Sequence, residues 1–131
     1  KVDMQSMDWQ TLVARRAKKD APDKGGWNVL ITSTSGADSL DPLTYSFISA
    51  ACDKAWFGWP CDEEITRLRN EFADETDEAK RKEIVEKLQL RAAEVPTHAF
   101  LGQYNNAMAI RKNVTGSVVS PVPVFWNIEK K

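Results

Sequence analysis

A short apolar segment that runs into a hydroxyl-rich loop constrains the fold of this chain more than any other feature. The pair Gly25-Gly26 precedes apolar and β-branched residues over 27–32, a pattern that predicts a buried strand. Serine and threonine then dominate, and one acid, Asp38, stands before Asp41-Pro42. Ligand sites of α/β proteins lie beyond the carboxyl ends of such strands. Because most polar loops bind nothing, the stretch alone favours a solvated connection that opens the next helix.

The residues before this segment predict a β-α-β unit. Residues 2–6 alternate apolar and polar side chains, as a half-buried strand does. Asp8 stands where it can cap a helix that continues through Arg16. Strand, helix and strand follow one another closely enough for a single crossover unit, and its hand should be right-handed.

Three further helices are predicted downstream. Pro42 suits the first turn of one helix, and Asp62 can cap a second. Residues 76–78 open a third, longer helix, whose outer face is charged and solvated. The last two helices carry apolar residues at helical spacing, namely Ile65, Leu68 and Phe72, and then Ile84, Val85, Leu88 and Ala92.

Two cysteines, Cys52 and Cys61, flank an aromatic loop. Redox pairs prefer two intervening residues, which this spacing does not match. A metal site would need two more ligands, and the single histidine, His98, has no local partner. The pattern therefore favours a disulfide, which would contribute about 2–3 kcal/mol, mostly by restricting the unfolded chain. A persistent disulfide indicates an oxidising compartment such as the bacterial periplasm.

Composition and motifs exclude several classes of function. The formal net charge of −1 gives no electrostatic reason to expect binding to nucleic acid. No apolar run approaches the roughly 20 residues of a membrane span. No Ser-His-Asp or Cys-His grouping is visible, so we expect a protein that is not an enzyme and that carries no metal or cofactor.

The beginning of the sequence suggests a longer protein, and its apolar tail suggests a packing partner. The chain begins at Lys1, in the middle of what should be a strand, which suggests a piece of a longer protein. Residues 99–104 predict a strand, and residues 117–128 form an apolar, β-prone tail with Pro121 and Pro123. These prolines confine the tail to an edge strand or an extended cover. Such a tail would pack on another lobe or on a second copy of the chain, as a homodimer.

Four stretches, by their order and spacing, carry a resemblance to a known family. They are Gly25–Pro42, the Cys52–Cys61 loop with the acidic helix after it, residues 76–82, and residues 101–127. Together they resemble the C-terminal part of the bacterial extracellular solute-binding proteins of family 5. Members of this family are of the dipeptide/oligopeptide-binding type, serve ABC transporters and are several times longer than this chain.

The resemblance implies a fold and a role. The fold would be α/β, part of a two-lobed clamp of the periplasmic-binding-protein type II kind that closes on its ligand. Residues 1–103 would be part of the C-terminal ligand-binding lobe, with a β-α-β unit and a helical part. Residues 104–131 would form the hinge crossing and the return segment to an N-terminal lobe that this sequence lacks. The role would be to capture a small solute, a peptide or peptide-like molecule, in the periplasm and to deliver it to an inner-membrane ABC permease.

The resemblance also points to ligand-binding residues. Peptide-binding relatives place an acid four residues before a proline, where it holds the α-amino group of the ligand, and this position falls on Asp38. A desolvated ammonium needs such a carboxylate partner. Relatives often have tryptophan just before this acid, where this chain has Ser33, Thr34 and Ser35, which points to a more polar ligand. The family also carries nickel complexes, opines, glutathione and oligosaccharides.

The alternative function is an interaction or oligomerisation module that binds no ligand.

Overall fold

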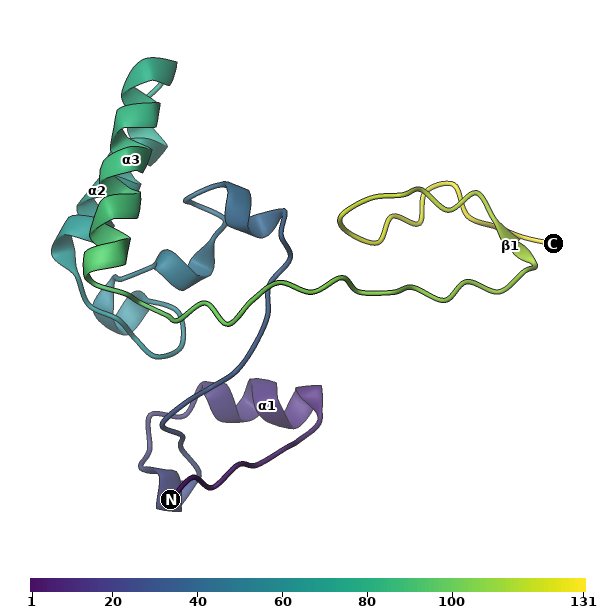
Figure 1. Cartoon of the computed structure of the whole chain (residues 1–131), viewed down its shortest axis with the longest axis horizontal. Coiled ribbons are helices and arrows are strands. Elements are labelled where there is room, and N and C mark those ends of the chain that lie inside the picture. Colours follow the sequence, from purple (N-terminus) through teal and green to yellow (C-terminus); the bar gives the residue numbers. More distant parts are fainter. The chain divides into compact units, whose positions relative to one another are not determined.

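Three α-helices and one small sheet make up the regular structure of the chain (Figure 1). The computed structural model describes every residue from 1 to 131, in two units that cover residues 1–33 and 34–131. The helices are α1 (Trp9–Arg16), α2 (Glu63–Asp74) and α3 (Glu78–Glu94), and the strands are β1 (Val114–Thr115) and β2 (Glu129–Lys130). Short 3₁₀ turns lie at Pro22–Lys24, Asp38–Leu40, Ser46–Ile48 and Cys52–Lys54. The regular structure of the chain is thus mixed α and β, and most of it is helix.

The first unit is a helix with a turn folded back onto it. The carboxylate of Asp8 accepts hydrogen bonds from the backbone N–H groups of Gln10 and Thr11, at 3.0 and 3.1 Å, so the predicted N-cap of α1 is confirmed. Arg15 donates through Nε and Nη2 to the carbonyl of Gly26, at 3.2 and 2.9 Å. A Cβ at Gly26 would lie 1.7 Å from the carbonyl oxygen of Asp20, so only glycine fits there.

The predicted β-α-β unit does not form. Residues 2–6 and 27–32 belong to no strand, although the helix between them is present. A strand exists only where a neighbouring strand takes up its hydrogen bonds, and alternation along the sequence does not supply that neighbour. Val29 and Ile31, predicted to be buried, are 80% and 69% exposed. The strand predicted over 99–104 is likewise absent, and the helix predicted at Pro42 is reduced to the 3₁₀ turn Ser46–Ile48.

The second unit is organised around α2 and α3, which pack side by side as a helical hairpin (Figure 1). Asp62 caps α2 by accepting from the N–H of Ile65 at 2.8 Å, and Asp77 caps α3 by accepting from the N–H of Lys80 at 2.9 Å. Both predicted helices are therefore confirmed with their N-terminal boundaries. The core of the hairpin consists of Ala50, Ile65, Leu68 and Leu88, all at most 1% exposed.

Two arginines of α3 connect the hairpin at opposite ends. Arg91, near the end of α3, forms an ion pair with Asp62 at the start of α2, with 2.7 Å between Nη2 and Oδ2. Arg81, near the start of α3, donates to the carbonyls of Phe72 and Glu75 at 3.0 Å each. The helices are therefore antiparallel. Hydrogen bonds from Arg91 also lower the pKa of the Asp62 carboxyl, which helps to keep this N-cap ionised.

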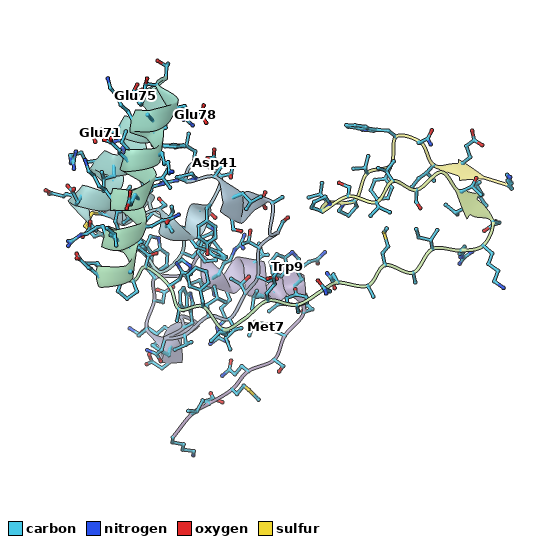
Figure 2. All side chains as sticks on the ribbon, turned by 45° about the horizontal axis from the view of Figure 1, so that its top comes forward. Met7, Trp9, Asp41, Glu71, Glu75 and Glu78 are labelled. Atoms are coloured by element: carbon cyan, nitrogen blue, oxygen red, sulfur yellow. A yellow bond between two sulfur atoms is a disulfide. The ribbon has the colours of Figure 1, made fainter.

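The acids at the turn of the hairpin have local roles. Figure 2 labels Glu71, Glu75 and Glu78 there. The Glu75 carboxylate accepts from the N–H groups of Thr76 and Asp77, at 2.8 and 2.9 Å, and Glu71 forms an ion pair with Arg67. The Glu75 contacts therefore order the connection between α2 and α3, whereas the Glu71 pair lies within α2.

The disulfide between Cys52 and Cys61 is present, as predicted. Ala51 and Cys61 form an antiparallel bridge, and the N–H of Cys52 donates to the carbonyl of Pro60 at 3.0 Å. Inside the loop, the ring of Trp56 packs edge-to-face on Phe47, with 4.6 Å between centroids. The disulfide therefore closes a loop whose end leads directly into the cap of α2.

The C-terminal tail folds back on itself. Strands β1 and β2 pair antiparallel, with Val114 opposite Lys130 and Thr115 opposite Glu129. A Cβ at Gly116, whose φ is +78°, would lie 1.8 Å from the carbonyl oxygen of Asn127, so this position requires glycine. Several apolar side chains between the strands face solvent, among them Val119 and Trp126. None of the three helices of the chain combines the length and the apolar character that crossing a bilayer demands.

Candidate functional site

The residue singled out by sequence, Asp38, begins the 3₁₀ turn Asp38–Leu40. Its N–H donates to the carbonyl of Ser35 at 3.1 Å, and the Ser35 hydroxyl accepts from the N–H of Ala37 at 3.2 Å. The Thr34 hydroxyl donates to Oδ2 of Asp38 at 3.4 Å. The structure thus brings Thr34, Ser35 and Asp38 together within the second unit, whereas Ser33 is the last residue of the first unit.

The carboxylate of Asp38 is open to solvent. The side chain is exposed, and the Thr34 hydroxyl, at a distance near the upper limit for a hydrogen bond, is its neighbour. The ion pairs of the second unit use other acids, namely Asp62, Glu64, Glu71 and Glu94. An unpaired carboxylate with adjacent hydroxyls can accept charge-assisted hydrogen bonds from an ammonium or guanidinium group that arrives from outside.

The backbone around Asp38 is held from two directions. The Thr44 hydroxyl lies 2.9 Å from the carbonyl oxygen of Asp38 and 3.3 Å from that of Asp41. Arg69 of α2 donates through Nε to the carbonyl of Pro42 at 3.0 Å and through Nη2 to that of Leu43 at 3.2 Å. Sequence reasoning missed Thr44 and Arg69. The sequence shows only that Arg69 follows Leu68 of the apolar face of α2, which does not reveal what the arginine reaches.

Beside this turn, Tyr45 and Phe47 form a hydrogen-bonded aromatic cluster with Thr97 and His98. The hydroxyl of Tyr45, which is 8% exposed, lies 2.7 Å from Nε2 of His98. Thr97 donates its hydroxyl hydrogen to the carbonyl of Phe47 at 2.6 Å, and its oxygen lies 3.0 Å from Nδ1 of His98. One assignment of donors and acceptors satisfies all of these groups. The Tyr45 hydroxyl donates to Nε2 of a neutral His98, and the Nδ1–H of His98 donates to the Thr97 oxygen. His98 is therefore a structural residue of this cluster.

The cluster makes folding stability depend on pH. Burial lowers the pKa of the His98 imidazole below its usual value, so the folded chain binds fewer protons than the unfolded chain near pH 6. The contribution of His98 to stability is complete above the unfolded pKa and is lost as pH falls through the folded pKa. We expect the melting temperature to drop between pH 7.5 and 5.5, and the drop to be smaller in His98→Gln, as followed by circular dichroism. An equal drop in both proteins would contradict this role.

No group of three or more His, Cys, Asp or Glu side chains is arranged to hold a metal ion. No family model matches the sequence.

A curated protein shares extended sequence similarity with the chain. It is a probable peptide ABC transporter periplasmic-binding protein from Sinorhizobium fredii, 32% identical over 123 residues, and the match covers 94% of this chain. The chain spans 23% of the length of that protein, so the similarity concerns a part of it. The relative is named as a binding protein and not as an enzyme. The similarity supports a relationship between this chain and the solute-binding proteins of ABC transporters.

Proposed function

We propose that the chain is part of the substrate-binding component of an ABC transporter. The similarity to a periplasmic-binding protein over 94% of the chain is the observation that carries this proposal. In this role the protein is located in the periplasm, binds a peptide or peptide-like solute without transforming it, and delivers it to a permease in the inner membrane. The Cys52–Cys61 disulfide agrees with an oxidising compartment.

The proposal includes the architecture of family 5, a two-lobed clamp of the type II kind. Residues 1–103 belong to the C-terminal ligand-binding lobe, and residues 104–131 cross the hinge and return to an N-terminal lobe. Residues 101–112 support this assignment, because they form no helix or strand and their side chains are exposed. A segment of this kind connects folded parts and does not belong to a core.

Within this clamp, Asp38 holds the α-ammonium group of the ligand. Its carboxylate is exposed and without an ion-pair partner, while Thr34 and Ser35 supply hydroxyls beside it. Ser33, the fourth residue predicted from the sequence, precedes Thr34 and belongs to the first unit. When the second lobe closes over the ligand and excludes water, the attraction between ammonium and carboxylate becomes stronger.

Calorimetry with matched ligands tests this proposal. Trialanine has a free ammonium group, and N-acetyl-trialanine lacks it. We expect the protein to bind trialanine with the higher affinity, and Asp38→Asn to weaken that binding by about tenfold or more, the range of a charge-assisted hydrogen bond. Glu86→Gln, which neutralises an exposed acid on α3, should bind as the wild type does.

Absence of heat with trialanine and with a panel of opines, nickel complexes, glutathione and oligosaccharides would contradict the receptor role.

The exposed apolar tail favours a second candidate function, an interaction module. Val119 is fully exposed and Trp126 is 95% exposed, and both lie in the tail between β1 and β2. Large apolar side chains left exposed in one segment are typical of surfaces that contact another protein. In this role the chain forms a homodimer, and light scattering should show the mass rising towards twice that of one chain with concentration. A constant monomer mass at high concentration would exclude this function.

A further inference from the structure

The half-buried arginine of α2, Arg69, binds no acid. Two other arginines of the hairpin pair with acids, Arg67 with Glu64 and Glu71, and Arg91 with Asp62, whereas Arg81 also donates to backbone carbonyls. Arg69 uses its guanidinium fork on two successive backbone carbonyls, those of Pro42 and Leu43. A charged fork that spans two carbonyls fixes the direction of the chain as well as its position. Arg69 therefore anchors the segment after the Asp38 turn to α2.

Thr44 extends this anchor back to Asp38. A hydroxyl has a single hydrogen to donate, and the shorter of its two contacts, at 2.9 Å, is to the carbonyl of Asp38. The Asp41 carbonyl accepts from the N–H of Tyr45 at 3.0 Å, and Oδ1 of Asp41, labelled in Figure 2, accepts from the N–H of Leu43 at 2.7 Å. The turn is thus closed on itself and attached to a buried residue.

The two anchors act on the backbone and leave the Asp38 carboxylate open. Tyr45 packs edge-to-face on Phe47 and His98, with ring centroids 5.6 and 5.4 Å apart, so the turn is held from the core side. No anchor contacts the acid side chain itself, whose hydrogen bond is to Thr34. A binding group with this arrangement is held in place before the ligand arrives, which reduces the entropy lost on binding.

We propose that Arg69 and Thr44 are positioning residues for ligand binding, which hold the Asp38 turn in the conformation that receives the ammonium group of a peptide-like ligand. This inference rests on the proposed function, since it assigns a purpose to the geometry of the same site.

Calorimetric titration of the protein that contains both proposed lobes, with trialanine and with N-acetyl-trialanine, tests the inference. Arg69→Lys keeps the charge and loses the fork, and Thr44→Val keeps the shape and loses the hydroxyl. We expect each variant to bind trialanine about tenfold more weakly and to lose most of the preference over N-acetyl-trialanine. Arg67→Lys, on the same helix but away from the turn, should bind as the wild type does, and Thr44→Ser should restore binding because it retains a hydroxyl.

The outcomes separate this inference from the proposed function. Wild-type preference for trialanine that is lost in Asp38→Asn but fully kept in both Arg69→Lys and Thr44→Val overturns the positioning role and leaves the receptor role intact. Absence of binding of either compound to a wild-type protein that contains both proposed lobes overturns both. The preference for a free ammonium is the decisive measurement, because a merely structural contribution of either residue would weaken both compounds equally.

Discussion

Leu88→Ala is expected to lower the free energy of unfolding of the second unit by about 3 kcal/mol, the usual cost of removing a fully buried leucine side chain. Leu88 is 1% exposed and is the buried residue that α3 contributes to the core. It packs in one cluster with Ile65 and Leu68 of α2 and with Ala50. Because this cluster has only four fully buried members, few neighbours can move in to fill the cavity.

The same helix provides a matched control. Leu90 stands two residues further along α3 and is 63% exposed, so Leu90→Ala should change the free energy of unfolding by less than about 0.5 kcal/mol. Urea denaturation followed by circular dichroism at 222 nm measures both variants, because α2 and α3 dominate the helical signal. Equal effects of the two substitutions would show that the hairpin core lies elsewhere.

Replacing both cysteines by serine is expected to lower the free energy of unfolding by about 2–3 kcal/mol. Both cysteines are exposed, so the substitution leaves no cavity, and the loss comes from the greater freedom of the unfolded loop. The antiparallel bridge between Ala51 and Cys61 leads into Asp62, the cap of α2, so loosening the loop also weakens the start of that helix.

Urea denaturation with and without dithiothreitol measures this effect. The reductant should destabilise the wild type to the level of the double serine variant and leave that variant unchanged. A wild type that resists urea equally well in both conditions would contradict a stabilising role for the disulfide.

The two helices of the hairpin, though not their antiparallel packing, could be predicted from sequence because each of their signals is local. Asp62 and Asp77 stand where a side-chain oxygen reaches the backbone N–H three residues later, and Ile65, Leu68 and Leu88 recur at helical spacing. The disulfide followed from the count and spacing of the two cysteines. None of these features depends on a partner far away in the sequence.

The strands could not be predicted in the same way. Residues 2–6 and 27–32 have the composition of strands, but a strand depends on a neighbour that a periodic pattern does not identify. The two strands that do form, β1 and β2, are two residues long each and are joined by the connection over residues 116–128. Their pairing depends on contacts between segments, which local sequence does not encode.

The sequence pointed to the acid of the candidate site, but not to the residues that hold the backbone around it. Asp38 was found through its place in a resemblance, and it remains a proposal for ligand binding. Arg69 and Thr44 could not be found, because their partners are backbone carbonyls, which have the same chemistry at every position in the sequence.

A crystal structure of the protein with trialanine bound measures the central claim most directly. The account predicts that the terminal ammonium nitrogen lies about 2.7–2.9 Å from a carboxylate oxygen of Asp38, the distance of a charge-assisted hydrogen bond. Trialanine bound at another place, or with its ammonium directed into solvent and away from Asp38, would contradict the account.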